Sequence, residues 1–514
     1  MEHFIDEKTV MQFYLERIKK DEILFLQGKD SLKEGIAGAL EKLCKESKMN
    51  NKIQLATVLW KKLFEASMSY ISSNKKGYDK IFKYFDSYVE FEELIFASDS
   101  FYRDHTLHCL WVYFLGEYLH NKPEFSELYR TERETKEGYK LLAKIPSKLE
   151  IIEGKDARAL KAVLKMAEES VSLSDSMRCL AALTHDLGYP LKKIEKINKS
   201  MNKVLPFFAI NNFDNFSFEY ENIQQEFVNQ FIDFISRQSI VNIAPREDLS
   251  EEAQEVLKRI LAAGEQGGGD VDIFLSGLEK LTEEEKALLK GSFVVETLFH
   301  SPFSQKAAYY NDFEAYQHGI MSAFLLMKNL QVFQDIDYLL PDRLMTIPDA
   351  KTLALHDILA SISNHTCDNY QIQKIDDNSF LTFVDELEEF SRISRASQNR
   401  EYVEEFCDTA LYMEDGWLNV VFEFNNNKLD NLDPEISFKG RCKRFLSLFD
   451  IANLDEYLKI RVTIVGKLPT DENEYVLEIA KNHADIRING ESKDIPKYLK
   501  STQYFTKEEY AKMK

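Results

Sequence analysis

The feature that most restricts the fold of this chain is the spacing of its apolar residues over the first 400 positions. Segments such as "DEKTVMQFYLERIKKDEILFL" (6–26) and "NKIQLATVLWKKLFEASMSYI" (51–71) repeat apolar residues every three or four positions, which predicts amphipathic helices. Similar stripes recur at 107–119, 172–186, 246–264, 312–330, 349–365 and 379–395. After about residue 410, apolar and polar residues alternate, as they do in half-buried strands. We therefore predict a mainly α protein with a small C-terminal α+β domain.

The same patterns suggest a division of the chain. Residues 1–95 form a helical N-terminal region, suited to packing or to formation of a homo-oligomer, and 96–400 form a larger helical domain. Within that domain, 191–300 is expected to be an insertion or lid, because its aromatic segment "PFFAINNFDNFSFEY" (206–220) is irregular and "EQGGGD" (265–270) breaks the pattern. Strands at 416–425, 457–467 and 474–481, with a helix at 434–449, make up the domain at 410–514.

Charge restricts the ligands that this chain can bind. Its 65 basic and 86 acidic residues give a formal net charge of −21, which repels phosphate backbones and anionic membranes. An extended nucleic-acid surface is therefore not expected. A small phosphate ester could still bind, but only in a pocket that carries its own positive charge.

The cysteines and the first residues bear on the compartment. The six cysteines occur singly with no CxxC spacing, which argues against a zinc ribbon and against a disulfide framework. "MEHFIDEKTV" lacks the form of a signal peptide, and the longest apolar runs are too short to span a bilayer. We expect a reduced, cytoplasmic protein with no membrane segment.

The most informative motif is "LAALTHDLGYP" (180–190), in which an apolar helix runs into His185 and Asp186 before Gly188 and Pro190 end it. A single His-Asp pair proves little. The question is whether other helices supply partner side chains for it.

Histidines on two other apolar helices are candidate partners. In "FYRDHTLHCLWVYFLG", His105 and His108 share a helical face, and the stripe that continues from His108 points this residue inward. In "EAYQHGIMSAFLL", His318 is followed by Gly319, which allows close approach of backbones. For His108 and His318, each taken alone, a core histidine is the favoured interpretation, and the second histidine one turn from His108 counts against it there.

Two further segments offer a histidine and a carboxylate. In "LALHDILASISNH", His356 and Asp357 form a second doublet, with His365 about two and a half turns later, so either histidine could be the inward one. In "FLTFVDELEEFSR", Asp385 sits at the edge of an apolar face, where it would be costly unless paired or metal-bound. Arg392, two turns along the predicted helix, is either its salt-bridge partner or a phosphate clamp.

Together these segments give a set of imidazoles and carboxylates, each on a separate helix of one region. Such ligands suit one or two divalent ions, with Mn, Fe, Ni, Co, Mg and Zn as candidates. The expected metal ligands are His108, His185, Asp186, His318, His356 and Asp385.

These motifs resemble those of the HD-domain superfamily of metal-dependent phosphohydrolases. "RDHTLHCLWVYFLG" is similar to the superfamily's first motif, "THDLGYP" to its defining His-Asp doublet, and "FLTFVDELEEFSR" to its last motif. The resemblance covers about 96–400, with 191–300 unmatched, and implies an HD-type helical bundle. "GYP" directly follows the first His-Asp here, unlike in the HD-GYP branch, so that branch's substrate is not carried over, and Tyr189 after Gly188 departs from the pattern of the deoxynucleotide triphosphohydrolases.

The resemblance implies hydrolysis of a phosphate ester, with a nucleotide or cyclic nucleotide as the expected substrate, by water activated at a His/Asp metal site. Asp186 would bridge two ions, and His105 would protonate the leaving oxygen. Arg103, Lys192, Lys193 and Arg392 are candidate substrate contacts; for the two lysines a solvated position is the alternative.

Two other interpretations stay open at this stage. An HD-like fold could serve as a non-enzymatic nucleotide-sensing or protein-interaction regulator. Alternatively, the strand-rich tail could be the functional unit, although it holds only one histidine, His483, and no Gly-rich phosphate loop.

Overall fold

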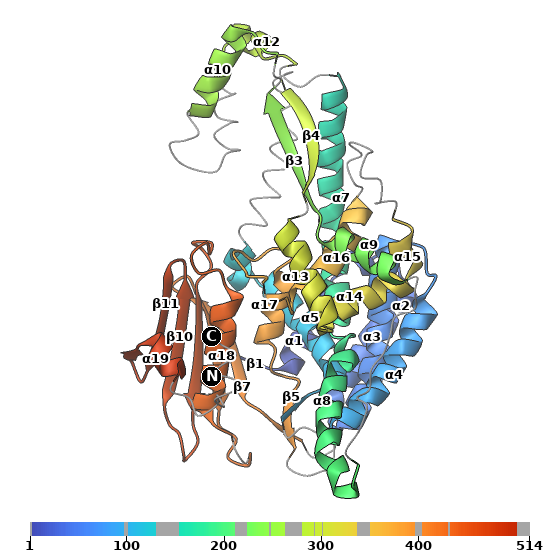
Figure 1. Ribbon diagram of the computed structural model, residues 1–514, viewed down its shortest axis with the longest axis vertical. Helices are drawn as coiled ribbons and strands as arrows, with labels where there is room; N and C mark the ends of the chain where they lie inside the picture. Colours follow the sequence, from blue (N-terminus) through green and yellow to red (C-terminus); the bar gives the residue numbers. More distant parts are fainter. Residues whose placement is uncertain are drawn as a thin grey trace.

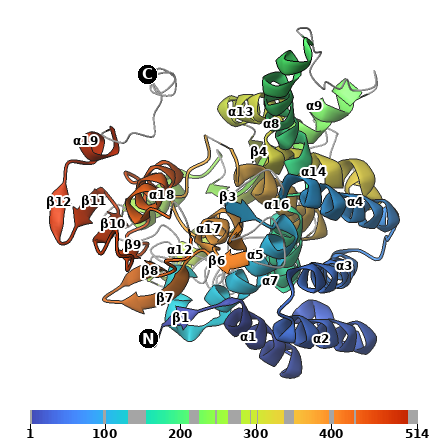
Figure 2. The same ribbon diagram turned by 90° about the horizontal axis from the view of Figure 1, so that it is seen from below.

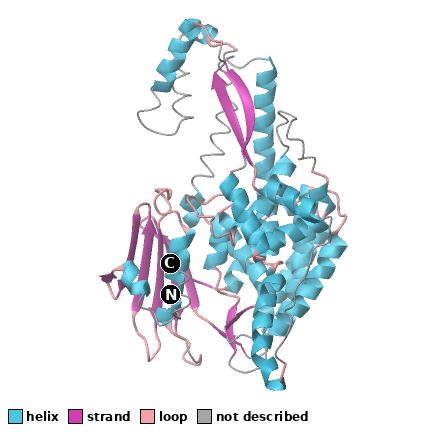
Figure 3. Ribbon diagram, viewed as in Figure 1, coloured by secondary structure: helices cyan, strands magenta, loops and turns pink. Residues whose placement is uncertain are grey.

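The computed structural model describes residues 3–96, 101–129, 154–210, 224–245, 248–262, 280–291, 293–300, 302–336, 350–367, 369–395, 403–429 and 432–500. Most of this chain is helical, and its principal sheet lies to one side of the helical body (Figure 3). A mainly α protein with a small C-terminal sheet is therefore confirmed. The domain boundaries and the HD-type assignment stay predictions.

The long helix α7 packs against α3, α5 and α16 in the helical body, and one end of it projects from the body beside β3 (Gln238–Pro245) and β4 (Phe293–His300) (Figures 1 and 2). The helices of the body are α1 (Glu7–Lys19), α2 (Asp30–Lys45), α3 (Met49–Ile71), α4 (Tyr78–Phe96), α5 (His105–Asn121), α7 (Gly154–Thr184), α8 (Tyr189–Val204), α9 (Gln224–Ile235), α13 (Phe303–Glu314), α14 (His318–Asn329), α15 (Gln331–Gln334), α16 (Ala350–Asn364) and α17 (Phe380–Leu387), with short 3-10 turns η1 (Leu24–Leu26), η2 (Pro123–Tyr129) and η3 (Leu205–Phe208). None of the described helices has the length and apolar character that a membrane span requires.

The N-terminal helices hold the C-terminal end of α7 in place. Trp60 on α3 donates a hydrogen bond to the carbonyl of Leu183 (2.7 Å), and Tyr84 on α4 donates one to the carbonyl of Leu187 (2.5 Å). Terminal helix carbonyls lack partners within their own helix, so these side chains satisfy groups that would otherwise be orphaned in the core. Residues 1–95 thus support the segment that carries His185 and Asp186.

Two of the predicted helices end earlier than their apolar stripes suggest. The stripe at 312–330 is interrupted after α13, where Tyr316 adopts a positive φ of 50°, and α14 begins afresh at His318. The stripe at 379–395 ends at Leu387, and Arg392 begins strand β5 (Arg392–Arg395). The expectation that Arg392 continues the helical face of Asp385 is therefore wrong.

Strand β5 lies in a small sheet with the order β2-β5-β6, where β2 is Phe101–Arg103 and β6 is Val403–Glu405. Arg103 stands opposite Arg392 in its register. Tertiary pairing with β2 thus overrides the helical periodicity of the sequence here, and it brings two cationic side chains together.

The C-terminal unit is a seven-stranded sheet with the order β1-β7-β8-β9-β10-β11-β12. β8 and β9 are parallel, so helix α18 makes the crossover between them. The elements are β1 (Phe4–Ile5), β7 (Asp408–Glu414), β8 (Trp417–Phe424), α18 (Pro434–Leu448), β9 (Ile460–Gly466), β10 (Glu474–Ala480), β11 (His483–Ile488), β12 (Glu491–Lys493) and α19 (Ile495–Lys500).

Main-chain hydrogen bonds fasten this sheet unit to the helical body. The N-terminal strand β1 pairs with β7 at the edge of the sheet. After α16, Ile372 donates to the carbonyl of Leu448 (2.8 Å), and Asp455 donates to the carbonyl of Gln373 (2.7 Å). The position of α18 relative to the helical body is therefore fixed by main-chain contacts on both sides of Phe449.

The described part of the block at 191–300 consists of helices and a two-stranded ribbon, and its expected role as an insertion or lid stays a prediction. After α8 and α9, strands β3 (Gln238–Pro245) and β4 (Phe293–His300) form an antiparallel ribbon that extends away from the helical body beside α7, with α10 (Glu251–Ala262) and α12 (Glu283–Leu288) at its far end (Figure 1). Most of the aromatic segment 206–220 and all of 265–270 lie outside the described residues.

Candidate metal centre

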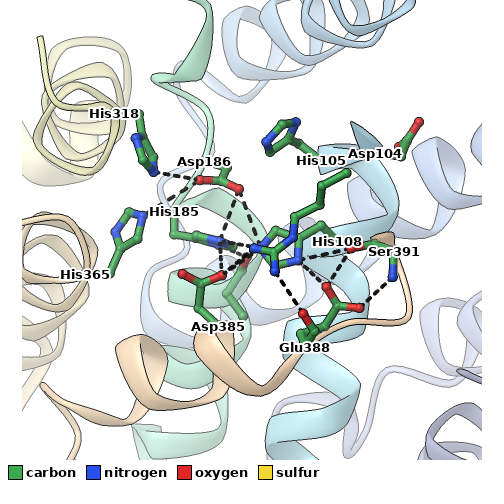
Figure 4. A network of polar contacts seen from close by, with 12 residues as sticks. Asp104, His105, His108, His185, Asp186, His318, His365, Asp385, Glu388 and Ser391 are labelled. Carbon is green, nitrogen blue, oxygen red and sulfur yellow. Dashed lines mark hydrogen bonds and ion pairs between the residues drawn. The ribbon is translucent and has the colours of Figure 1, made fainter. Parts of the chain in front are cut away.

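Side chains from five separate helical segments converge at one point of the helical body (Figure 4). His108 comes from the first turn of α5, His185 and Asp186 follow α7, and Asp385 lies on α17. Two further histidines complete the group: His318 begins α14 and His365 follows α16.

Local sequence explains how α5 and α7 present these residues. Asp104 is the N-cap of α5 and accepts hydrogen bonds from the amides of Thr106 and Leu107 (both 3.1 Å), so the helix begins at His105. In the segment after α7, a Cβ on Gly188 would lie 2.3 Å from the carbonyl oxygen of His318. Only glycine therefore allows α14 to approach the segment that follows His185 and Asp186.

The first set of donor atoms consists of His108, His185, Asp186 and Asp385. His108 Nε2 lies 2.8 Å from Asp385 Oδ1, 3.4 Å from His185 Nε2 and 3.7 Å from Asp186 Oδ2. His185 Nε2 is 3.4 Å from Asp186 Oδ2 and 3.9 Å from Asp385 Oδ1. The donor atoms of His108, His185 and Asp186 are thus close enough to hold an ion, and Asp385, 277 positions from His108 in the sequence, lies beside both histidines.

A second set shares Asp186. His318 Nε2 lies 3.2 Å and His365 Nε2 lies 3.8 Å from Asp186 Oδ1, the oxygen that faces away from His108 (Figure 4). His365 is only 2% exposed, and its Nε2 has no hydrogen-bond partner in the described part of the protein. A buried nitrogen of this kind calls for a ligand, and its direction toward Asp186 indicates a cation.

His356 lies elsewhere, which corrects its expected place among the ligands. Its Nδ1 is 2.9 Å from the carboxylate of Asp357, and its ring lies against Phe234. Both histidines belong to the segment of α16, but nine residues separate them, and two and a half helical turns direct them to opposite sides. His365 therefore takes the place expected for His356.

A matched pair of variants tests this exchange. His365→Ala is expected to lower the affinity for the second ion by at least about tenfold, since a ligand is lost, whereas His356→Ala should leave metal content unchanged. Metal content is measured in both purified variants after dialysis against increasing concentrations of a chelator. Loss of metal from the His356 variant with retention in the His365 variant would reverse the assignment.

The ring orientations of the histidines are set by neighbours on the far side of each imidazole. His185 Nδ1 donates to the carbonyl of Ala182 (2.7 Å), and His365 Nδ1 donates to that of Ile362 (2.5 Å). His108 Nδ1 bonds to Glu388, a carboxylate that also accepts from the amide and hydroxyl of Ser391 (2.7 and 2.6 Å). Each arrangement leaves Nε2 directed inward, as metal-ligating histidines require.

Glu388 was not singled out from the sequence, and its substitution offers a direct test of this arrangement. Glu388→Gln is expected to weaken metal binding 10- to 100-fold, because the amide cannot orient His108 or raise its basicity as a carboxylate does. Titration with Mn²⁺ measures this, and Glu386→Gln, on the same segment but paired with Arg444, serves as the control. Equal affinity in the Glu388 variant and the wild type would remove this role.

The electrostatics of the cluster favour a positive charge at its centre. Burial would lower the pKa of His108, but its hydrogen bonds with Asp385 and Glu388 outweigh burial and raise this pKa to about 9. Burial lowers the pKa of His185 to about 4, so its ring is neutral. Burial would raise the pKa of Asp186, yet the surrounding imidazoles hold it well below its usual range. An ionised Asp186 carboxylate beside the neutral imidazole of His185 offers donor types that divalent metals select, and a metal ion at the centre would take the place of the proton on His108 Nε2.

A cavity of about 440 Å³ opens beside the cluster, within the size range of small-molecule sites. Its lining includes these predicted site residues: Arg103, His105, Asp186, Lys193, His318, Asp385 and Arg392. Lys192 does not belong to the lining, because it is directed at the carbonyl of Ala315 (3.3 Å), which corrects its expected role. Of the described residues between 191 and 300, only Lys193 reaches this cavity, so the described part of that block does not cover it.

The cationic and aromatic residues of the wall are linked to one another. Arg103 lies 3.4 Å from Asp385 and donates to the carbonyl of Glu388 (3.0 Å). His105 Nδ1 is 2.7 Å from the buried carboxylate of Glu92. The ring of Tyr189 is tilted against that of His105 and lies edge-to-face with that of His318, with centroid distances of 4.1 and 4.8 Å.

The sequence did not single out several wall or support residues, among them Glu92, Tyr189, Glu388 and Arg444. Glu388 and Tyr189 stand within the quoted motifs, three residues from predicted ligands, so proximity was a usable signal. Glu92 and Arg444 come from segments with no such signal.

No known protein family, curated protein or solved structure matches this chain. What the structure itself shows is a set of buried histidine and aspartate groups, among them His108, His185, Asp186 and His365, whose donor atoms are close enough to hold a metal ion.

Proposed function

We propose that this protein is a metal-dependent hydrolase of a small phosphate ester, with a nucleotide as the expected substrate class. The observation that carries the proposal is the sharing of Asp186 between two sets of donors, at 3.4–3.7 Å on one oxygen and 3.2–3.8 Å on the other. Two ions about one carboxylate suit in-line displacement at phosphorus.

The residues around the cluster have complementary parts in this proposal. His108, His185 and Asp186 would hold one ion, with Asp385 beside both histidines as a further ligand, and Asp186, His318 and His365 would hold the other. Bound metals lower the pKa of water and neutralise charge on phosphoryl oxygens.

The cavity wall supplies proton transfer and charge. His105 lines the cavity with Nδ1 engaged by Glu92, so a proton given to the leaving oxygen would come from Nε2. Arg103 and Arg392 place cationic groups at the same wall, where they would bind the phosphoryl oxygens.

Elemental analysis followed by a substrate panel tests this proposal. The purified protein is expected to hold about one or two transition-metal ions per chain and, with Mn²⁺ added, to hydrolyse one of a panel of nucleoside phosphates, cyclic nucleotides, dinucleotides and aryl phosphates. Absence of metal after reconstitution would remove the proposal. Bound metal with no turnover on any of these classes would favour a ligand-binding regulator instead.

A further inference from the structure

Arg444 is the feature of the cavity wall that belongs to the other structural unit. It lies on α18, the crossover helix of the C-terminal sheet, yet its side chain lines the cavity beside His365 and Asp385. The candidate metal ligands all come from the helical body. The described wall of this cavity is therefore built from both units.

The guanidinium of Arg444 is held in a defined place. Nε pairs with Glu386 Oε1 at 2.5 Å, and Nη2 donates to the carbonyl of His365 (3.3 Å), the residue whose Nε2 is directed at Asp186. The side chain keeps 39% of its surface exposed. Arg444 is thus held by these two contacts while part of its side chain remains exposed at the cavity, an arrangement that pre-organises a cation for an incoming anion.

The anchoring of α18 makes this placement rigid. Three residues before Arg444, Arg441 pairs with the buried Glu389 (2.6 Å), which also pairs with Arg392 (2.8 Å) and Arg103 (3.5 Å). Glu389 therefore links α18 to the two arginines of β2 and β5 that reach the cavity. The main-chain bonds around Phe449 fix the end of the same helix.

The residues that line the cavity carry more positive than negative charge. Arg103, Lys193, Arg392 and Arg444 line it with three carboxylates, Asp186, Asp385 and Glu386, a formal balance of +1 among the lining residues in a chain of net charge −21; the buried Glu389, outside the lining, pairs with Arg103 and Arg392. Without Arg444 the balance is zero. A phosphorylated ligand entering such an acidic protein needs this local reversal of sign.

We propose that Arg444 binds an anionic group of the substrate, so that the C-terminal α+β unit completes the substrate site of the helical body. The inference rests on the proposed function in taking that anionic group to be a phosphate. It gives the C-terminal unit a part in ligand recognition, and it predicts that Arg444 contributes to binding rather than to metal retention.

Binding of methylenediphosphonate, which resists hydrolysis, tests the inference on the full-length protein by isothermal titration calorimetry. Arg444→Gln is expected to weaken binding at least about tenfold, with unchanged metal content, because one charge-assisted contact is lost. Arg487→Gln is the matched control: this arginine belongs to the same unit, is 40% exposed and is paired with Glu478 and Asp485. It should bind as the wild type does.

A further variant separates a ligand contact from a structural role. Glu386→Gln removes the negative charge opposite Arg444 but keeps an amide oxygen that can accept from Nε, so the guanidinium should stay in place and binding should be retained or tighter. Equal loss in the Arg444 and Glu386 variants, wild-type binding in Arg444→Gln, or no binding to the wild type would each overturn the inference. A tenfold loss confined to Arg444→Gln in a protein without hydrolase activity would uphold the anion contact while removing the proposed function.

Discussion

Replacement of Asp186 by alanine should abolish phosphate-ester hydrolysis, with a loss on the order of 1,000-fold or more, and should release bound metal. Asp186 approaches four imidazoles within 3.2–3.8 Å, and both of its oxygens are engaged. Its removal takes a ligand from each set at once, so neither ion keeps its charge compensation. Metal analysis and turnover on the best substrate of the panel measure the effect.

Two further variants make this result interpretable. Asp186→Asn keeps the shape of the side chain and should lose metal as well, which separates the loss of charge from a packing defect. Asp357→Ala removes the carboxylate of the other His-Asp doublet, which is 30% exposed, and should keep metal and activity. Normal turnover in both Asp186 variants, with native circular dichroism, would refute a metal site at this position.

Glu117→Gln should lower the free energy of unfolding by about 3 kcal/mol or more. Glu117 on α5 is 1% exposed and pairs with Arg17 of α1 and with Arg178 of α7 (2.9 Å for the latter), so one carboxylate joins three helices of the body. The amide leaves two buried guanidinium groups without their shared counter-charge. Denaturant unfolding measures this change, because the variant should shift the midpoint.

Glu22→Gln is the matched control, because Glu22 also pairs with Arg17 but is 48% exposed. An exposed pair contributes little, so this variant should change stability by less than about 1 kcal/mol. Equal effects of the two substitutions would contradict the role assigned to burial.

The pH dependence gives a second readout. Burial alone would raise the pKa of Glu117, but Arg178 and Arg17 outweigh it and lower this pKa to about 2. A depressed folded-state pKa contributes stability that is present above the unfolded value of about 4.3 and is lost as pH falls toward 2. The difference in stability between wild type and Glu117→Gln should therefore shrink below about pH 4. A constant difference down to pH 3 would argue against the ion pairs.

Periodicity was enough to indicate which histidines and carboxylates face inward, where the helix itself determines direction. His108 lies on an apolar stripe of α5, and His185 and Asp186 follow the apolar stripe of α7. The apolar residues next to them in the sequence therefore predicted that these side chains are buried. The choice between His356 and His365 could not be made in this way, because each follows a buried residue of the α16 segment. Only the packing of α14 against the C-terminal end of α16 distinguishes the two histidines. Close contact there depends on Gly319, whose Cβ would lie 2.5 Å from the carbonyl of Ile362.

By itself, the sequence determined the mainly helical character, the strand-rich C-terminal unit and the residue types able to hold a cation, because each depends on side-chain spacing within one segment. Tertiary structure alone decided that β1 joins the C-terminal sheet, that Arg392 leaves the helix for a strand beside Arg103, and that Arg444 faces the cavity. These depend on contacts between segments far apart in the chain. Their free energy comes from pairing and burial that no local pattern records.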